Sequence, residues 1–300
     1  MTYFLELFFS GLTRGSIYAL IALGYTMVYG SIGLINFAHG EIYMIGAFTA
    51  LIAASVLSGW GLNPVLVLVL SALAAMIWAA AYGVTVERIA YRPLRQAPRL
   101  SPLISAIGMS MVLQNFVLLA QTPDFVPFPS LIPKFAFLAP YRDILGSSGL
   151  VILVTTAVAM LLLIFLIKGT KLGCAMRAVA QDKEMALLLG IDVDRVISAT
   201  FAIGSVLAGL GGVLIASHIG QINFAIGFLA GIKAFTAAVL GGVGSVPGAV
   251  LGGLILGWTE SFATGYVSSD YEDVFAFVLL VLILIFRPSG LLGRRVNRKV

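Results

Sequence analysis

The sequence predicts an all-α integral membrane protein, a bundle of about nine (8–10) helices that cross the bilayer. First, 60% of the 300 residues are hydrophobic and only 10% are charged, whereas about 25% of a soluble domain is charged. Second, several apolar stretches reach the roughly 20 residues that a helix needs to cross the hydrocarbon core. Third, the polar stretches between them are too short for a soluble domain, so residues 1–300 are expected to form a single transmembrane domain.

The apolar stretches define the expected crossings in order along the chain. Residues 4–12 are apolar but too short to cross alone. The crossings are expected at about 14–30, 41–58, 63–85, 101–121, 149–168, 196–217, 228–243, 248–266 and 273–288.

The orientation follows from the basic residues, because short cytoplasmic loops are enriched in Lys and Arg. Fourteen of the 18 basic residues fall in three regions, which are therefore expected in the cytoplasm together with the C-terminus. The stretch 122–148, which holds five prolines, is then an external loop, and the odd number of crossings places the N-terminus outside. The three regions comprise Arg88, Arg92, Arg95 and Arg99; Lys168, Lys171, Arg177, Lys183 and Arg195; and Arg287, Arg294, Arg295, Arg298 and Lys299.

An internal repeat is the most informative pattern in the chain. Residues 33–40 (GLINFAHG) recur as 220–227 (GQINFAIG), and 47–50 (AFTA) recur as 234–237 at the same offset. The copies lie five crossings apart, so they are expected to run in opposite directions, as in many transporters. The repeat halves cover about 14–168 and 196–288. The alternative is a duplicated packing unit without a transport role.

The segment 169–195 is too polar to cross the membrane and is patterned as two short helices. Asp182 suits the N-cap of the second helix and Gly190 the position after its last turn, while the first is expected around 173–180. Met185, Ala186, Leu188 and Leu189 are available for burial. Such a hairpin either contacts a partner protein or lies on lipid headgroups, where its Lys and Arg residues are favourable; the pattern alone does not decide.

Polar residues inside apolar segments are costly and are therefore functional candidates. Candidate residues of a translocation pathway are Asn36, His39 and Glu41 in one repeat copy, with Asn223 and Lys233 in the other. The alternatives are that His39 and Glu41 lie at a membrane interface and that Asn36 and Asn223 cap helices.

Glycines indicate close helix packing and one break. Gly244, Gly248 and Gly252 form a series of small residues four apart, a spacing that lets helices approach in lipid. The stretch from Gly241 to Gly248 contains Pro247 and is expected to interrupt the helix. Packing is the commoner role of such glycines; freeing backbone groups for a substrate is the alternative.

Several function classes are excluded or disfavoured. No Gly-Lys dipeptide and hence no Walker A loop is present, and neither H-E-x-x-H nor G-x-S-x-G occurs. No catalytic residue, metal site or cofactor is expected, and a single cysteine, Cys174, allows no internal disulfide. The net charge is +5, but the basic residues lie at the expected membrane edges, which disfavours a nucleic-acid partner.

Five stretches together resemble the branched-chain amino-acid ABC transporter permeases, in particular the H-type membrane subunits of high-affinity leucine/isoleucine/valine import systems. They are Gly33–Gly46, Tyr91–Arg95, Ser105–Asn115, Arg177–Arg195 and Lys233–Gly257. The resemblance implies that 169–195 is the segment coupled to the ATPase, with Arg177, Asp182, Ala186 and Gly190 in or beside it.

The resemblance also implies partners and a location. It implies a second homologous permease, two cytoplasmic ATPase subunits that use the ATP, and a periplasmic or extracellular substrate-binding protein, all at the bacterial inner membrane. The transported substrate would be a branched-chain amino acid. Urea or short amides remain an alternative, as do an ion-driven secondary amino-acid transporter and a passive channel.

Overall fold

The computed structural model describes residues 2–98, 100–141 and 144–293, and these residues are almost entirely helical. The α-helices are α1 (Thr2–Ile32), α2 (His39–Ser58), α3 (Pro64–Val86), α4 (Leu100–Ala120), α5 (Ser147–Gly169), α6 (Lys171–Gln181), α7 (Lys183–Leu188), α8 (Val193–Ile219), α9 (Ile226–Gly241), α10 (Val246–Tyr266) and α11 (Glu272–Phe286). Two short strands, β1 (Val126–Pro127) and β2 (Gln221–Ile222), pair antiparallel.

Each expected crossing coincides with one helix, which confirms the all-α membrane fold. Seven helices of the described part are long and apolar enough to span a bilayer. The helices α9 and α11, of 16 and 15 residues, are shorter, so the count of nine stays a prediction.

The first crossing begins earlier than the sequence predicted. Residues 4–12 are not a separate stretch but the start of α1, which runs unbroken for 31 residues. No proline interrupts this region, and at about 1.5 Å per residue the helix is about 46 Å long, longer than the hydrocarbon core.

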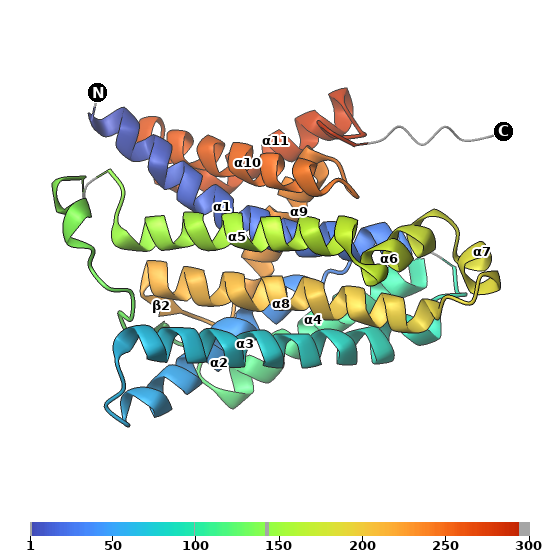
Figure 1. The fold of residues 1–300 in the computed structure, drawn as a ribbon. Helices are drawn as coiled ribbons and strands as arrows, with labels where there is room; N and C mark the ends of the chain where they lie inside the picture. The colour runs from blue at the N-terminus through green and yellow to red at the C-terminus, as the bar shows by residue number, and fades with distance from the viewer. Residues whose placement is uncertain (1, 99, 142–143, 294–300) are drawn as a thin grey trace.

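The polar segments gather at two opposite ends of the bundle (Figure 1). One end, called the basic end below, carries α6, α7, the start of α8 and the turns that follow α3 at Glu87–Leu94. The opposite loop end carries the start of α1, β2 and residues 122–141. There β1 pairs with β2, and the Phe128 amide donates to the Gly220 carbonyl at 2.8 Å.

This arrangement agrees with the prediction that the basic regions share one side of the bundle, while the side that faces the cytoplasm stays a prediction. Two of the three basic regions lie together at the basic end, and α11 also ends on that side. Arg99, the basic residues at 294–299 and the C-terminus lie outside the described residues.

The two repeat copies run in opposite directions, as predicted: α1 leads toward the basic end and α8 away from it (Figure 1). After each of these helices comes a glycine with a left-handed backbone, Gly33 at φ +72° and Gly220 at φ +78°. A Cβ on Gly40 would lie 2.3 Å from the Gly227 carbonyl oxygen, and one on Gly227 would lie 2.8 Å from that of Gly40. Equivalent residues of the two copies therefore contact each other, as expected at an axis that relates inverted halves.

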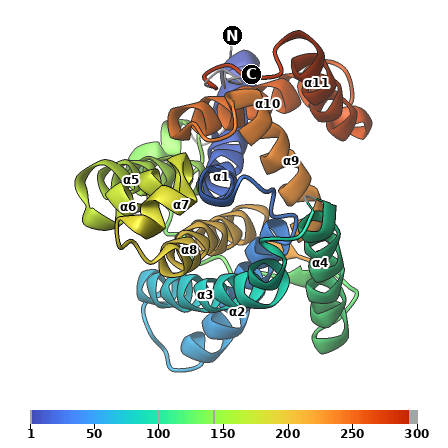
Figure 2. The same cartoon turned by 90° about the vertical axis from the view of Figure 1, so that its right-hand side faces the viewer.

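The helix α1 occupies the middle of the bundle (Figure 2) and packs against α5, α8, α9 and α10. The helices α4 and α5 lie at the periphery and expose most of their apolar surface, including Ile104, Leu119, Leu161 and Phe165. This surface fits contact with lipid, the solvent in which exposed apolar helices are stable.

The opposite placement of the two ends makes a labelling prediction. In a Cys174→Ala background, Pro123→Cys and Glu184→Cys place single exposed thiols at the loop end and the basic end. We expect a membrane-impermeant maleimide to label position 123 from outside intact cells, and position 184 only in inside-out vesicles. Labelling of both from the same side would contradict the topology.

Candidate functional site

The helical hairpin α6–α7 is built as the sequence predicted. Asp182 caps α7, its Oδ1 accepting from the amides of Glu184 at 2.9 Å and Met185 at 3.0 Å. At the other end, Gly190 has φ +81°, and the amides of Gly190 and Ile191 donate to the carbonyls of Leu187 and Ala186 at 3.0 Å each. Both hydrogen bonds form the Schellman motif that ends a helix.

The outward face of α7 matches the predicted one at Met185, Leu188 and Leu189 and differs at Ala186. Ala186 was grouped with the surface available to a partner, but it is 2% exposed and faces the body of the protein. The outward side chains are apolar: Met185, Leu187, Leu188 and Leu189 are 54 to 81% exposed. Ala186 thus packs the hairpin onto its own chain, where a small side chain fits, and the leucines form the free surface.

The hairpin is fixed to the membrane helices at several points. Met176 and Val179 of α6 are buried against the bundle, and Arg177 donates to the Ile167 carbonyl near the end of α5. Lys183 Nζ donates to the Ile32 carbonyl, the last residue of α1, at 3.2 Å. Burial, and secondly the nearby Arg95, lower the pKa of Lys183.

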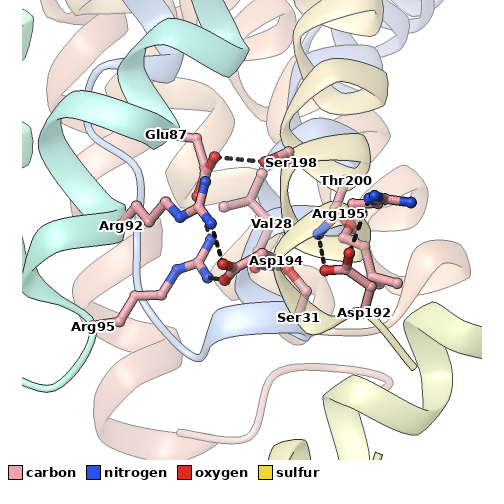
Figure 3. A network of polar contacts seen from close by, with 11 residues as sticks. Val28, Ser31, Glu87, Arg92, Arg95, Asp192, Asp194, Arg195, Ser198 and Thr200 are labelled. Carbon is pink, nitrogen blue, oxygen red and sulfur yellow. Dashed lines mark hydrogen bonds and ion pairs between the residues drawn. The ribbon is translucent and has the colours of Figure 1, made fainter. Parts of the chain in front are cut away.

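An ionic network joins the turns after α3 to the start of α8 (Figure 3). Asp194 accepts from both Arg92 and Arg95, and Arg95 also pairs with Glu87. Glu87 is fully buried, and its second oxygen accepts from the Ser198 hydroxyl at 2.7 Å. The start of α8, which follows the hairpin in the chain, is therefore held to the turns after α3.

The two arginines of this network are expected to differ in their effect on stability. Arg95→Gln leaves the buried Glu87 carboxylate without its cation, which costs about 3–5 kcal/mol. Arg92→Gln removes only a half-exposed ion pair to Asp194, which is worth about 0–1 kcal/mol. Thermal unfolding of the two purified variants in detergent measures this difference, and equal shifts in Tm would contradict it.

Asn36 and Asn223 are not the N-cap residues of the helices that follow them, which was the alternative role for these two residues. The caps of α2 and α9 are Ala38 and Ala225. The Asn36 side chain instead accepts from the Tyr91 hydroxyl at 3.1 Å, and Asn223 accepts from the Ala225 amide at 3.2 Å. Asn36 is buried, and its hydrogen bond connects the loop before α2 to the turn after α3.

His39 and Glu41 are buried in the interior of the helical bundle. His39 is 1% exposed and packs edge-on to the Tyr25 ring at 4.8 Å between centroids. Glu41 is fully buried and its Oε1 accepts from Ser110 at 3.1 Å. A Cβ on Gly227 would lie 2.5 Å from Glu41 Oε2, so the carboxylate is enclosed between α2, α4 and α9.

Lys233 is the centre of a second ionic cluster, on the side of the loop end. Its Nζ lies 3.2 Å from Glu260, 3.0 Å from Glu272 and 2.8 Å from Asp273. Sequence reasoning missed Arg14, which pairs with Glu272 at 3.1 Å, and Tyr18, which donates to Glu260 at 2.7 Å. Neither belongs to the repeated motif; the signal was their position as polar residues inside the apolar α1.

The glycines at the turn between α9 and α10 have two different roles. The helix break at Gly241–Gly248 is confirmed, with Ser245 as N-cap of α10 accepting from the Gly248 amide at 3.2 Å. A Cβ on Gly241 would lie 1.9 Å from the Gly248 carbonyl oxygen, and one on Gly252 would lie 2.0 Å from that of Ala237. Gly244 has open space around it and φ +91°, so it serves the turn and not the packing.

Inverted repeats in a multi-pass helical bundle, with a capped hairpin outside the membrane helices, define a membrane transport subunit. Residues 7–284 match the family model described as "Branched-chain amino acid transport system / permease component". The chain belongs to this family.

Curated relatives match over nearly the whole chain. The high-affinity branched-chain amino acid transport system permease protein BraD of Pseudomonas aeruginosa is 51% identical, and LivH of Escherichia coli is 49% identical. Both alignments cover 99% of this chain and 98% of the relative. A probable LivH permease of Methanocaldococcus jannaschii is 29% identical over 91% of this chain and 88% of its own length.

Proposed function

We propose that this chain is the permease subunit, without an ATPase site of its own, of an ATP-driven importer of branched-chain amino acids in the bacterial inner membrane. The observation that carries the proposal is the identity of about half of all residues, end to end, with permeases of high-affinity branched-chain amino acid transport systems. The basic end and the C-terminus face the cytoplasm in this proposal.

The proposed partners match the two ends of the bundle. A second homologous permease completes the pathway, and two ATPase subunits dock at the basic end, where α7 presents its leucines. A periplasmic or extracellular binding protein delivers the amino acid at the loop end. An apolar helical face that the chain itself leaves uncovered supports a protein partner there.

The structure supports a route from the hairpin to the membrane helices. The hairpin contacts the last residue of α1 through Lys183 and continues directly into α8. Since α1 and α8 are equivalent helices of the inverted repeats, a displacement of the hairpin acts on both halves. ATP binding to the partners shifts the conformational equilibrium only if they bind the two states differently.

Transport by the complete complex tests the proposal. The permeases, ATPases and binding protein are reconstituted in vesicles, and uptake of radiolabelled leucine, isoleucine, valine, urea and acetamide is measured. We expect ATP-dependent uptake of the three amino acids alone. Uptake of urea or acetamide, uptake that follows an ion gradient without ATP, or passive flow without ATPase and binding protein would each overturn it.

A further inference from the structure

A cavity of about 440 Å³ lies beside the ionic cluster of Lys233, between α1, α8, α9 and α11. Arg14, Lys233 and Glu272 form its charged side. Its apolar side includes Ile17, Ile219 and Leu229. Its volume falls within the range of about 300–1,000 Å³ that small-molecule sites occupy.

The charged side of the cavity contains more ionised side chains than helix packing requires. Two cations, Arg14 and Lys233, and three carboxylates, Glu260, Glu272 and Asp273, come together from four helices. Charged side chains inside membrane helices are costly and are usually retained for function. Apolar side chains would hold the same helices together without the cost of removing charges from water.

The charges form an inner and an outer layer. In the inner layer, the fully buried Glu260 is held by Tyr18 and Lys233. In the outer layer, Arg14 and Glu272 pair at 3.1 Å, with side chains that are 35 and 26% exposed and line the cavity. Arg14 and Glu272 are thus more accessible to an entering molecule than Lys233, which is 10% exposed.

We propose that the cavity is a transit site for a zwitterionic amino acid with an aliphatic side chain, which inserts between Arg14 and Glu272. The α-carboxylate takes the place of Glu272 on Arg14, and the α-ammonium takes the place of Arg14 on Glu272. The net charge stays the same and each charged group keeps a partner, so the cost of an unpaired charge is avoided. The aliphatic side chain then lies against Ile17, Ile219 and Leu229.

This site deepens the proposed function and rests on it. It lies toward the loop end, where the binding protein is proposed to release the amino acid. It also predicts that a neutral molecule such as urea is a poor substrate, since urea cannot replace either charge of the separated pair.

The test compares charge variants in the complete reconstituted importer. Arg14→Gln and Glu272→Gln should each lower leucine uptake by about tenfold or more, since one charge of the zwitterion loses its partner. Both variants should still co-purify with the ATPase subunits. Asp270→Asn, which removes an exposed carboxylate close by in sequence, is the matched control and should transport normally.

The double variant Arg14→Gln/Glu272→Gln separates transit from structural support. If the pair only holds α1 to α11, removing both charges leaves no unpaired charge and uptake should recover. If the pair receives the amino acid, uptake should stay as low as in the single variants. Recovery in the double variant would overturn the site.

A variant without a charge change keeps the proposal testable where the charge variants do not assemble. Ala230 lines the cavity, and Ala230→Leu narrows it while leaving every charge in place. We expect it to slow leucine uptake more than valine uptake; an unchanged ratio of the two rates would overturn the site.

Failure of the site and failure of the proposed function give different results. If the unmodified complex shows no ATP-driven leucine uptake, the proposed function itself fails. If the unmodified complex transports leucine and the double variant does too, only the site fails.

Discussion

Replacing Leu188 by Arg is expected to release the ATPase subunits from the permease and to stop transport. Leu188 is the most exposed leucine of α7, at 81%, and it has Leu187 and Leu189 beside it. In a packed protein interface the arginine would be an unpaired buried charge, costing about 3 kcal/mol or more and weakening retention by roughly a hundredfold. On lipid headgroups the same arginine would extend into water and be tolerated.

Pull-down of the ATPase subunits, with the amount of membrane-inserted permease measured in parallel, tests this expectation. Gln181→Arg is the control, because it adds the same charge at an exposed position of the same hairpin. Normal retention and uptake with Leu188→Arg would mean that α7 rests on lipid, and the coupling assignment would move to residues 86–99. The variant Ala186→Arg is unsuitable as a test of docking, because Ala186 is buried and the arginine would disrupt the packing of the permease itself.

The structural features that depend only on neighbouring residues, such as helix ends and breaks, were predicted from the sequence. Asp182 and Gly190 were identified as the ends of α7 because caps act within a few residues of the chain. The break before α10 followed from glycines and Pro247 for the same reason. The burial of Ala186 could not be predicted, since a helix of six residues has too few turns to show which side faces the protein.

Contacts between segments that lie far apart in the sequence could not be predicted. Lys233 was recognised as a costly polar residue, but its partners come from α10 and α11, at distances along the chain that no local pattern specifies. Arg14 and Tyr18 were missed because neither lies in the repeated motif, 33–40 and 220–227. Asn36 was likewise recognised as a costly polar residue, whereas its partner Tyr91 becomes visible only when the turn after α3 is placed.

The contact between α1 and α10 shows how little space such long-range packing leaves. A Cβ on Gly257 would lie 2.3 Å from the Gly15 amide nitrogen and 2.4 Å from the Gly11 carbonyl oxygen. These neighbours are backbone atoms of a helix and cannot rotate away as a side chain can. Close approach of this kind is what holds helices together in lipid, where the hydrophobic effect between them is absent.

Gly257→Val is therefore expected to prevent stable packing of α1 on α10. Overpacking usually costs about 1–3 kcal/mol, and a cost at or above the upper end is expected when only backbone can move. Gly108→Val is the matched control: Gly108 lies inside α4, is exposed, and has open space where a Cβ would be. The Tm of thermal unfolding in detergent and the yield of monodisperse permease should fall sharply for Gly257→Val and little for Gly108→Val. Equal behaviour of the two variants would mean that α1 and α10 do not approach as closely as this structure places them.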